Sequence, residues 1–258
     1  MKTRNALLII DAQNDFCDPE GALSVPGAVE DAERLSRFIT DQQDEIDHVC
    51  LTMDSHPIHD ISHPSFWEDQ KGNPPAPFTG ISATDVHEGK WRPRLAAEAA
   101  KAYLEKLEQQ GEFPHVIWPH HCLIGSWGHG LFPPILKAVI EWSKASGKDY
   151  QTEIKGTYPL TEHFGIFQAQ IPMADRPETQ RNQRLLDELN LFDRVYLAGQ
   201  AKSHCVATSL KQIMDFSPEL ARKIVVLENT MSDVPNMGHL GEPIYERARA
   251  EDIVFEQV

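Results

Sequence analysis

The chain lacks several features that would assign it to a common class of protein. None of its 258 residues belongs to an apolar run approaching the roughly 20 residues of a membrane span. The 4 cysteines include no C-x-x-C pair, which removes the usual signature of zinc-finger and thiol-redox proteins. A G-x-S-x-G motif is also missing, and this disfavours a serine hydrolase. Since no segment repeats along the chain, repeat architectures are excluded as well.

Positive charge is too scarce for a nucleic-acid-binding protein. Lys and Arg number 24 against 39 Asp and Glu, which gives a formal net charge of −15. We therefore expect neither nucleic acid nor an anionic membrane as a partner. The N-terminal apolar run is cut by Asp11, and no small-residue cleavage site follows it. These features predict a cytoplasmic protein whose cysteines stay reduced.

Apolar runs alternate with helical patterns along the chain, which indicates an α/β fold. Residues 6–10 (ALLII) form a continuous apolar run, typical of a parallel strand buried on both faces. Further strands are predicted at residues 47–53, 150–154, 195–198, 223–227 and 253–255, and helices at 28–40, 95–110, 131–144, 180–189, from 205 onward and at 243–249. The prediction is a single three-layer α/β domain over residues 1–258 with a mostly parallel sheet.

Hydrophobic periodicity disappears between residues 55 and 93. This segment is rich in His, Pro, Gly and Asp, and we expect a long irregular loop there. Good helix formers follow at residues 95–110, with apolar side chains at helical spacing. The loop and helix, at residues 57–114, are predicted to be an insertion that covers the functional site or forms a subunit contact in a homo-oligomer.

Three predicted strands lead into residues that could form a catalytic site. Asp11 follows the first strand, Lys155 follows the strand at 150–154, and Cys205 lies where the strand at 195–198 passes into a helix. Each alone has a simpler interpretation, namely a loop cap, a solvated strand end and a packed core thiol. Because sites of open α/β sheets form at this edge, their matching positions favour a shared function.

The chemistry of these three residue types fits nucleophilic catalysis. Cys205 would be the nucleophile, and the positive end of the helix together with Lys155 would lower the pKa of its thiol. Asp11 would take the thiol proton and return it to a leaving amine. Backbone N–H groups at the start of the helix could hold the oxyanion of an acyl-transfer intermediate.

A second group of residues has the chemistry of a metal site. In Asp54-Ser55-His56 an extended backbone directs the aspartate and the histidine to the same face, and His121 supplies another imidazole. One carboxylate and two imidazoles make a three-ligand site with open positions, which suits zinc or iron. The spacing therefore predicts Asp54, His56 and His121 as metal ligands.

Most of the 12 histidines must be bystanders to such a site. His59 and His63 have the i, i+4 spacing of two ligands on one helix. Pro57 and Pro64 argue against a helix at that place. Neither histidine is therefore included in the predicted ligand set.

Five motifs stand in order over nearly the whole chain. They are Ile10-Asp11-Ala12-Gln13-Asn14-Asp15-Phe16, Asp54-Ser55-His56-Pro57, Trp118-Pro119-His120-His121-Cys122, Ile154-Lys155-Gly156-Thr157 and Gly199-Gln200-Ala201-Lys202-Ser203-His204-Cys205-Val206. Together they resemble the motifs of the isochorismatase-like cysteine hydrolases, and most nearly those of the nicotinamidase branch. The resemblance implies a Rossmann-like, doubly wound domain with about six parallel strands.

The resemblance also implies a role for each site residue. The catalytic triad would be Asp11, Lys155 and Cys205, and the oxyanion hole would be the backbone N–H groups of Ala201 and Cys205, next to a cis peptide at Gln200–Ala201. A divalent metal, zinc before iron or manganese, would be held by Asp54, His56 and His121, with no organic cofactor. Phe16 and Trp118 would flank the substrate ring, and Phe164 would line the same pocket.

The implied reaction is the hydrolysis of a small amide, nicotinamide first, through a cysteine thioester. Two departures leave the substrate open. The insertion is longer than in compact nicotinamidases, and Phe164 and Gly165 stand where nicotinamidases commonly have Tyr and Ser. The alternatives are a related hydrolase of N-carbamoyl or other linear amides, and a non-catalytic binding protein on the same fold.

Overall fold

The apolar run near the N-terminus forms strand β1 (Asn5–Ile10), all six residues of which are buried. The computed structural model describes residues 3–111 and 113–258 of the chain. Strand β1 pairs in parallel with β2 (Ile46–Asp54) on one side and with β6 (Arg194–Gly199) on the other. Its central place explains why the run is continuously apolar rather than alternating.

The main sheet has six strands, all parallel, in the order β5-β2-β1-β6-β7-β8. Its outer strands are β5 (Gln151–Lys155), β7 (Ile224–Leu227) and β8 (Val254–Glu256). Strands follow outward from β1 in one direction and from β6 in the other, so the order reverses between these two. This is the predicted doubly wound α/β fold, and each of the six predicted strands is confirmed.

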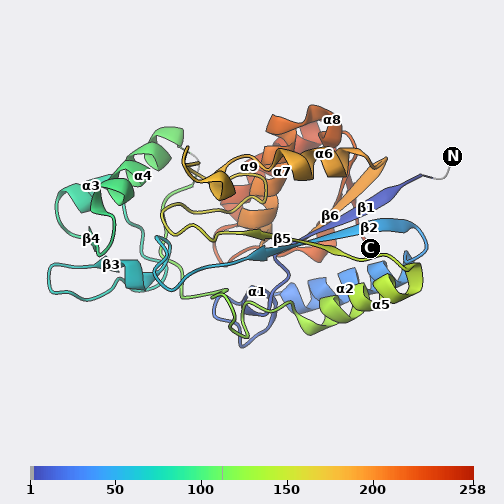
Figure 1. Cartoon of the computed structure of the whole chain (residues 1–258), viewed down its shortest axis with the longest axis horizontal. Coiled ribbons are helices and arrows are strands. Elements are labelled where there is room, and N and C mark those ends of the chain that lie inside the picture. The colour runs from blue at the N-terminus through green and yellow to red at the C-terminus, as the bar shows by residue number, and fades with distance from the viewer. Residues whose placement is uncertain (1–2, 112) are drawn as a thin grey trace.

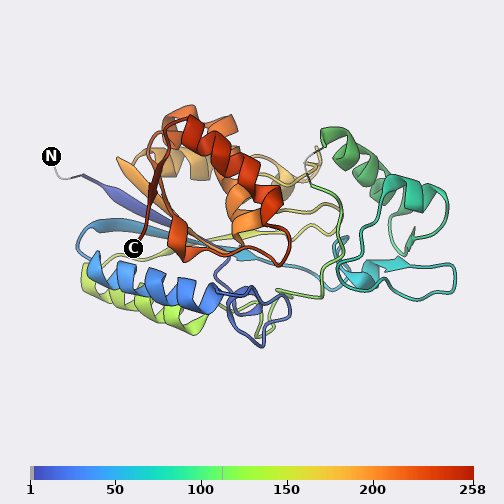
Figure 2. The same cartoon turned by 180° about the vertical axis from the view of Figure 1, so that it is seen from behind.

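Helices cover both faces of this sheet and complete three layers (Figure 1). One face carries α2 (Ala28–Asp41) and α5 (Pro133–Ser146), which pack against each other. Figure 2 shows the opposite layer from behind, formed by α6 (Gln183–Asn190), α7 (Ala207–Phe216), α8 (Pro218–Ala221) and α9 (Gly238–Ala250). No helix in the described part of the chain has the length and apolarity that a membrane span requires.

The helix boundaries follow from local chemistry. Helix α6 begins three residues later than the predicted 180–189, because the Asn182 side chain accepts a hydrogen bond from the Leu185 N–H and caps the helix there. Helix α9 begins five residues before the predicted 243–249 and contains Pro243 in its interior. Shorter elements that the periodicity did not predict are α1 (Asn14–Cys17), α8 and the turns η2 (Pro177–Thr179), η3 (Lys202–Val206) and η4 (Glu228–Thr230).

The segment expected to be an irregular loop contains regular structure, so that prediction is wrong in part. It includes η1 (Pro64–Phe66), α3 (Ala83–His87) and an antiparallel pair of short strands, β3 (Trp67–Glu68) and β4 (Arg92–Pro93), followed by α4 (Ala97–Gln110). These elements share a hydrophobic cluster of their own, which includes Trp67 and Tyr103. Figure 1 shows them at the end of the molecule opposite both chain termini. Elements of two to five residues are too short to produce a recognisable hydrophobic periodicity in the sequence.

Candidate active site

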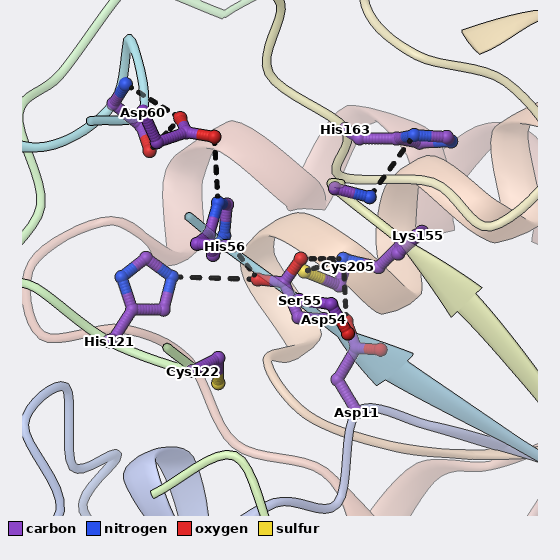
Figure 3. Close-up of polar contacts among 12 residues, drawn as sticks. Asp11, Asp54, Ser55, His56, Asp60, His121, Cys122, Lys155, His163 and Cys205 are labelled. Atoms are coloured by element: carbon purple, nitrogen blue, oxygen red, sulfur yellow. Dashed lines mark hydrogen bonds and ion pairs between the residues drawn. The ribbon is translucent and has the colours of Figure 1, made fainter. Parts of the chain in front are cut away.

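Four strands deliver functional side chains to the carboxyl edge of the sheet. Asp11 comes directly after β1, Asp54 and Lys155 are the last residues of β2 and β5, and Cys205 lies in the π-helical turn η3 that follows β6. These strands lie next to one another on both sides of the point where the strand order reverses. The side chains therefore converge at the place where ligands bind in doubly wound folds, as Figure 3 shows.

The Lys155 ammonium is the centre of this cluster. Its Nζ atom lies 2.9 Å from Asp11 Oδ2, 2.9 Å from Asp54 Oδ1 and 3.7 Å from Cys205 Sγ. Burial by itself would lower the pKa of Lys155, but the two carboxylates together raise that pKa well above its usual range. The lysine is therefore a permanent buried cation that holds both acids and the thiol within contact distance.

The pKa values of the two aspartates beside Lys155 are shifted in opposite directions. Burial raises the pKa of Asp11, although Lys155 and a 2.5 Å hydrogen bond from Thr52 Oγ1 to Asp11 Oδ1 partly offset this effect. Burial would also raise the pKa of Asp54, but His56 and Lys155 lower it well below its usual range. Asp54 consequently stays ionised, and Asp11 is the carboxylate that can accept and return a proton.

Cys205 is brought to the edge by a tight passage out of β6. Gly199 has a φ of +113°, and a Cβ atom there would lie only 2.0 Å from the Ile10 carbonyl oxygen, so no other residue fits. Burial raises the pKa of the Cys205 thiol well above its usual range, and Lys155 offsets this only in part because Asp11 and Asp54 raise it further. The expectation of a lowered thiol pKa is wrong: the sulfur is protonated until a base removes its proton.

The predicted oxyanion-hole residues are Ala201, which directly precedes η3, and Cys205, which lies within it. The peptide bond between Gln200 and Ala201 is cis, as the resemblance implied. The N–H of Ala201 makes no hydrogen bond within the described residues, whereas the next N–H, of Lys202, donates to Ser232 O. Ala201 and Cys205 line the same cavity. A carbonyl oxygen placed in that cavity could accept the Ala201 N–H.

The three predicted metal ligands meet on the other side of Asp54. His56 Nε2 lies 3.0 Å and His121 Nε2 3.5 Å from Asp54 Oδ2. Donors about 2.1 Å from a tetrahedral zinc ion are about 3.4 Å from one another, so this spacing fits a bound metal. Asp54 therefore contacts Lys155 through one oxygen and the histidines through the other, which joins the metal site to the catalytic cluster (Figure 3).

His63 joins this group, although the sequence analysis set it aside. Ring nitrogens of His56, His63 and His121 all lie within 4.8 Å of one another, and all three residues are buried. Burial lowers the pKa of His63, which keeps its imidazole neutral and able to bind a metal. The prolines do prevent an α-helix here, as predicted, since His63 has an extended backbone with φ −108° and ψ 152° before η1, but the imidazole reaches the other two without a helix. The sequence offered one signal for His63 as a ligand, namely that it lies between His56 and His121 along the chain.

The predicted pocket residues Phe16, Trp118 and Phe164 lie around a cavity that also reaches Cys205. The remaining lining residues are Leu23, Asp54, His121, Glu162, Ala201, His204 and Val234. Its volume is about 20 Å³, room for about one water molecule, so a ring-sized substrate requires the aromatic walls to move apart. Burial lowers the pKa of His204 to about 4, and this side chain is therefore neutral at pH 7.

Glu162 is a pocket residue that the sequence analysis did not predict, and its buried carboxyl makes stability depend on pH. Burial, with help from Asp60 and Asp54, raises the pKa of Glu162 from 4.5 to about 8. Between these values the folded protein keeps a proton that the unfolded chain has released, so stability falls as pH rises towards 8. The loss reaches at most about 5 kcal/mol.

Glu162→Gln cannot ionise and is expected to remove this decline. The free energy of unfolding, measured in urea at pH 5, 6.5 and 8 with chelator present, should fall less steeply for the variant than for the natural chain. Glu105→Gln, at an exposed position on α4, serves as the control and should leave the slope unchanged. Equal slopes for Glu162→Gln and the natural chain would contradict the assignment.

Comparison with known proteins agrees with the fold. The chain is 26% identical to a nicotinamidase of Saccharomyces cerevisiae over 254 residues, 98% of each chain. The structure of yeast nicotinamidase bound to the inhibitor nicotinaldehyde superimposes with a TM-score of 0.68 at 19% identity, over 99% of this chain and 100% of that one. A pyrazinamidase of Pyrococcus horikoshii in complex with zinc has a TM-score of 0.59 at 18% identity, over 99% of both chains. No protein-family model matches the chain.

An isochorismatase family protein from Desulfovibrio vulgaris also superimposes, with a TM-score of 0.54 at 15% identity, over 98% of this chain and 100% of that one. The chain therefore has the isochorismatase-like hydrolase fold, as its motifs indicated. Within that fold its full-length homologues include nicotinamidases, at low sequence identity.

Proposed function

We propose that this chain is a cysteine amidohydrolase that cleaves small amides, with nicotinamide as the first candidate. The observation that carries the proposal is the position of Lys155 Nζ, 2.9 Å from Asp11 and 3.7 Å from Cys205. These groups supply a proton acceptor, a fixed cation and a nucleophile at one end of an aromatic-lined cavity. Homology to nicotinamidases at low identity supports the same class of reaction.

The proposed reaction begins with transfer of the thiol proton from Cys205 to Asp11. The sulfur attacks the amide carbonyl carbon, and the N–H groups of Ala201 and Cys205 hold the resulting oxyanion. Asp11 then gives the proton to the leaving nitrogen, so the C–N bond breaks, ammonia departs and a thioester remains. Asp11 next takes a proton from water, whose oxygen attacks the thioester. Release of the carboxylic acid returns that proton to the sulfur.

Lys155 stabilises charge throughout this cycle without transferring a proton. Its pKa is raised well above the usual range, so it stays an ammonium at every step. When the thiol proton moves to Asp11, negative charge moves from the carboxylate to the sulfur, and both atoms are within reach of the Nζ atom. The cation therefore makes the thiolate accessible in a site where burial alone opposes it.

Asp54, His56 and His121 would hold a divalent metal, and His63 lies beside them in the same histidine cluster. Imidazole and carboxylate ligands together suit zinc, with iron or manganese as alternatives. Such an ion would supply a Lewis acid able to hold an aromatic ring nitrogen of the substrate. Asp54 and His121 line the same cavity as Cys205, so a substrate held by such an ion would lie in the cavity that the sulfur faces.

A second candidate substrate class is N-carbamoyl or other linear amides. One feature leaves the substrate open: the position beside the cavity where nicotinamidases commonly have a tyrosine is Phe164, which offers no hydroxyl. Gly165 follows, and a Cβ atom there would lie 2.3 Å from Gln212 Oε1, so a serine could not be accommodated without movement. The pocket wall is accordingly less polar than the resemblance alone would suggest.

Ammonia release separates the candidates. Purified protein loaded with Zn²⁺ is expected to hydrolyse nicotinamide and pyrazinamide, and removal of the metal by a chelator should sharply reduce turnover of both, because the ring nitrogen loses its partner. Hydrolysis of an N-carbamoyl amino acid alone, insensitive to the chelator, would instead establish the second candidate. No ammonia from any of the three would reject the amidohydrolase proposal.

A further inference from the structure

His56 is contacted at both ring nitrogens by buried carboxylates. Its Nε2 atom lies 3.0 Å from Asp54 Oδ2, on the side of the other metal donors. Its Nδ1 atom lies 3.1 Å from Oδ2 of Asp60, four residues further along the chain, in an ion-pair contact in which neither atom makes a hydrogen bond to any described residue (Figure 3). Asp60 is 1% exposed and does not line the cavity beside Cys205. Its carboxylate therefore contacts neither solvent nor a substrate in that cavity, so the burial of this charged group needs another explanation.

The loop fixes the orientation of this carboxylate. Asp60 Oδ1 accepts hydrogen bonds from the Ser62 N–H at 2.9 Å and from the Ser62 hydroxyl at 2.7 Å. The backbone is held too, because the Ile61 N–H donates to Pro159 O and the His63 N–H donates to Asp60 O. With Oδ1 engaged in this way, Oδ2 is left to face His56. Such rigidity is expected of a group that positions another side chain.

We propose that Asp60 is the positioning residue of the metal site: its carboxylate, at ion-pair distance from His56 Nδ1, holds the imidazole ring so that the Nε2 lone pair is directed at the metal. A ligating histidine commonly donates its other N–H to a carboxylate, which fixes the ring and increases its donor strength. The inference rests on the metal site of the proposed function. It extends that site to a residue that contacts neither metal nor substrate and acts through His56.

Asp60→Asn tests the inference with a change of little volume. An asparagine has one acceptor oxygen, but donors face position 60 on two sides, from Ser62 and from His56 Nδ1. Either orientation of the amide sets its N–H₂ group against a donor, so the His56 ring is no longer held as it is by Asp60. Affinity for Co²⁺, measured by competition with a chromophoric chelator, is expected to fall about 10- to 100-fold. The visible absorption spectrum of the bound Co²⁺ should change as well.

Asp85→Asn is the matched control, since this aspartate in the same insertion holds Ser82 and Lys90 through its carboxylate. It should bind Co²⁺ as the natural chain does, and thermal melting should show that both variants are folded. Unchanged Co²⁺ affinity and spectrum in Asp60→Asn, or failure of the natural chain to bind Co²⁺, would overturn the inference. The readout uses Co²⁺ alone, so a failure of the amidase proposal appears separately, as absent ammonia release with Co²⁺ binding still dependent on Asp60.

Discussion

Replacing Cys205 with alanine is expected to reduce amide hydrolysis by a factor on the order of 10³ or more. The variant has no sulfur to form the thioester, and no other nucleophile in the described residues shares the Lys155 contact at 3.7 Å. The fold should survive, because alanine fills most of a thiol site and Lys155 keeps both of its carboxylate partners. Ammonia release at saturating substrate and the thermal melting temperature measure the two effects.

Cys50→Ala provides the comparison for this experiment. Cys50 is buried like Cys205, but it lies within β2 among apolar neighbours, away from the strand ends. This variant should lose a comparable amount of packing and keep its activity. If Cys205→Ala hydrolysed the substrate at the rate of Cys50→Ala, covalent catalysis at position 205 would be excluded.

The sequence allowed the sheet and the catalytic cluster to be predicted for the same physical reason. Strands buried on both faces are continuous apolar runs. The apolar runs of β1 and β6 stop at Asp11 and Gly199, so the ends of both strands could be read from the sequence. Parallel strands place their carboxyl ends together, so Asp11, Lys155 and Cys205 could be assigned to one edge before any distance was known.

The metal site was predicted less completely, because its remaining parts come from a segment without periodicity. His63 was judged by helical spacing, yet it reaches its partners from an extended backbone. No motif in the sequence marks Asp60 or Glu162. The role of each is evident only from the residues that surround it in the structure. Contacts made by an irregular chain depend on its whole path, which no local pattern encodes.

The pKa of Cys205 was not predicted correctly, for a different reason. A position at the start of a helix, beside a lysine, predicts a lowered thiol pKa. In the folded chain the same lysine is shared with Asp11 and Asp54, and burial outweighs its effect on the sulfur. Desolvation and competition among charges depend on how many groups crowd one site, and residue types at strand ends do not reveal that number.

Replacing Lys155 with methionine is expected to destabilise the protein by about 3–5 kcal/mol at pH 8 in the absence of metal. Methionine fills the space of the lysine stem but leaves Asp11 and Asp54 buried without their shared cation. Both carboxylates are buried, so their mutual repulsion is poorly screened. Catalysis should also be lost, because the thiolate form of Cys205 would no longer have the Lys155 ammonium beside it.

The pH dependence of this loss identifies its cause. As pH falls, one of the two aspartates takes up a proton and the repulsion between them disappears, so the difference in unfolding free energy from the natural chain should shrink between pH 8 and pH 5. Urea unfolding at both pH values measures it. Lys148→Met, at a surface lysine paired with Asp47, is the control and should cost under about 1 kcal/mol at either pH. A pH-independent loss in Lys155→Met would attribute the effect to packing and remove the electrostatic role assigned to this lysine.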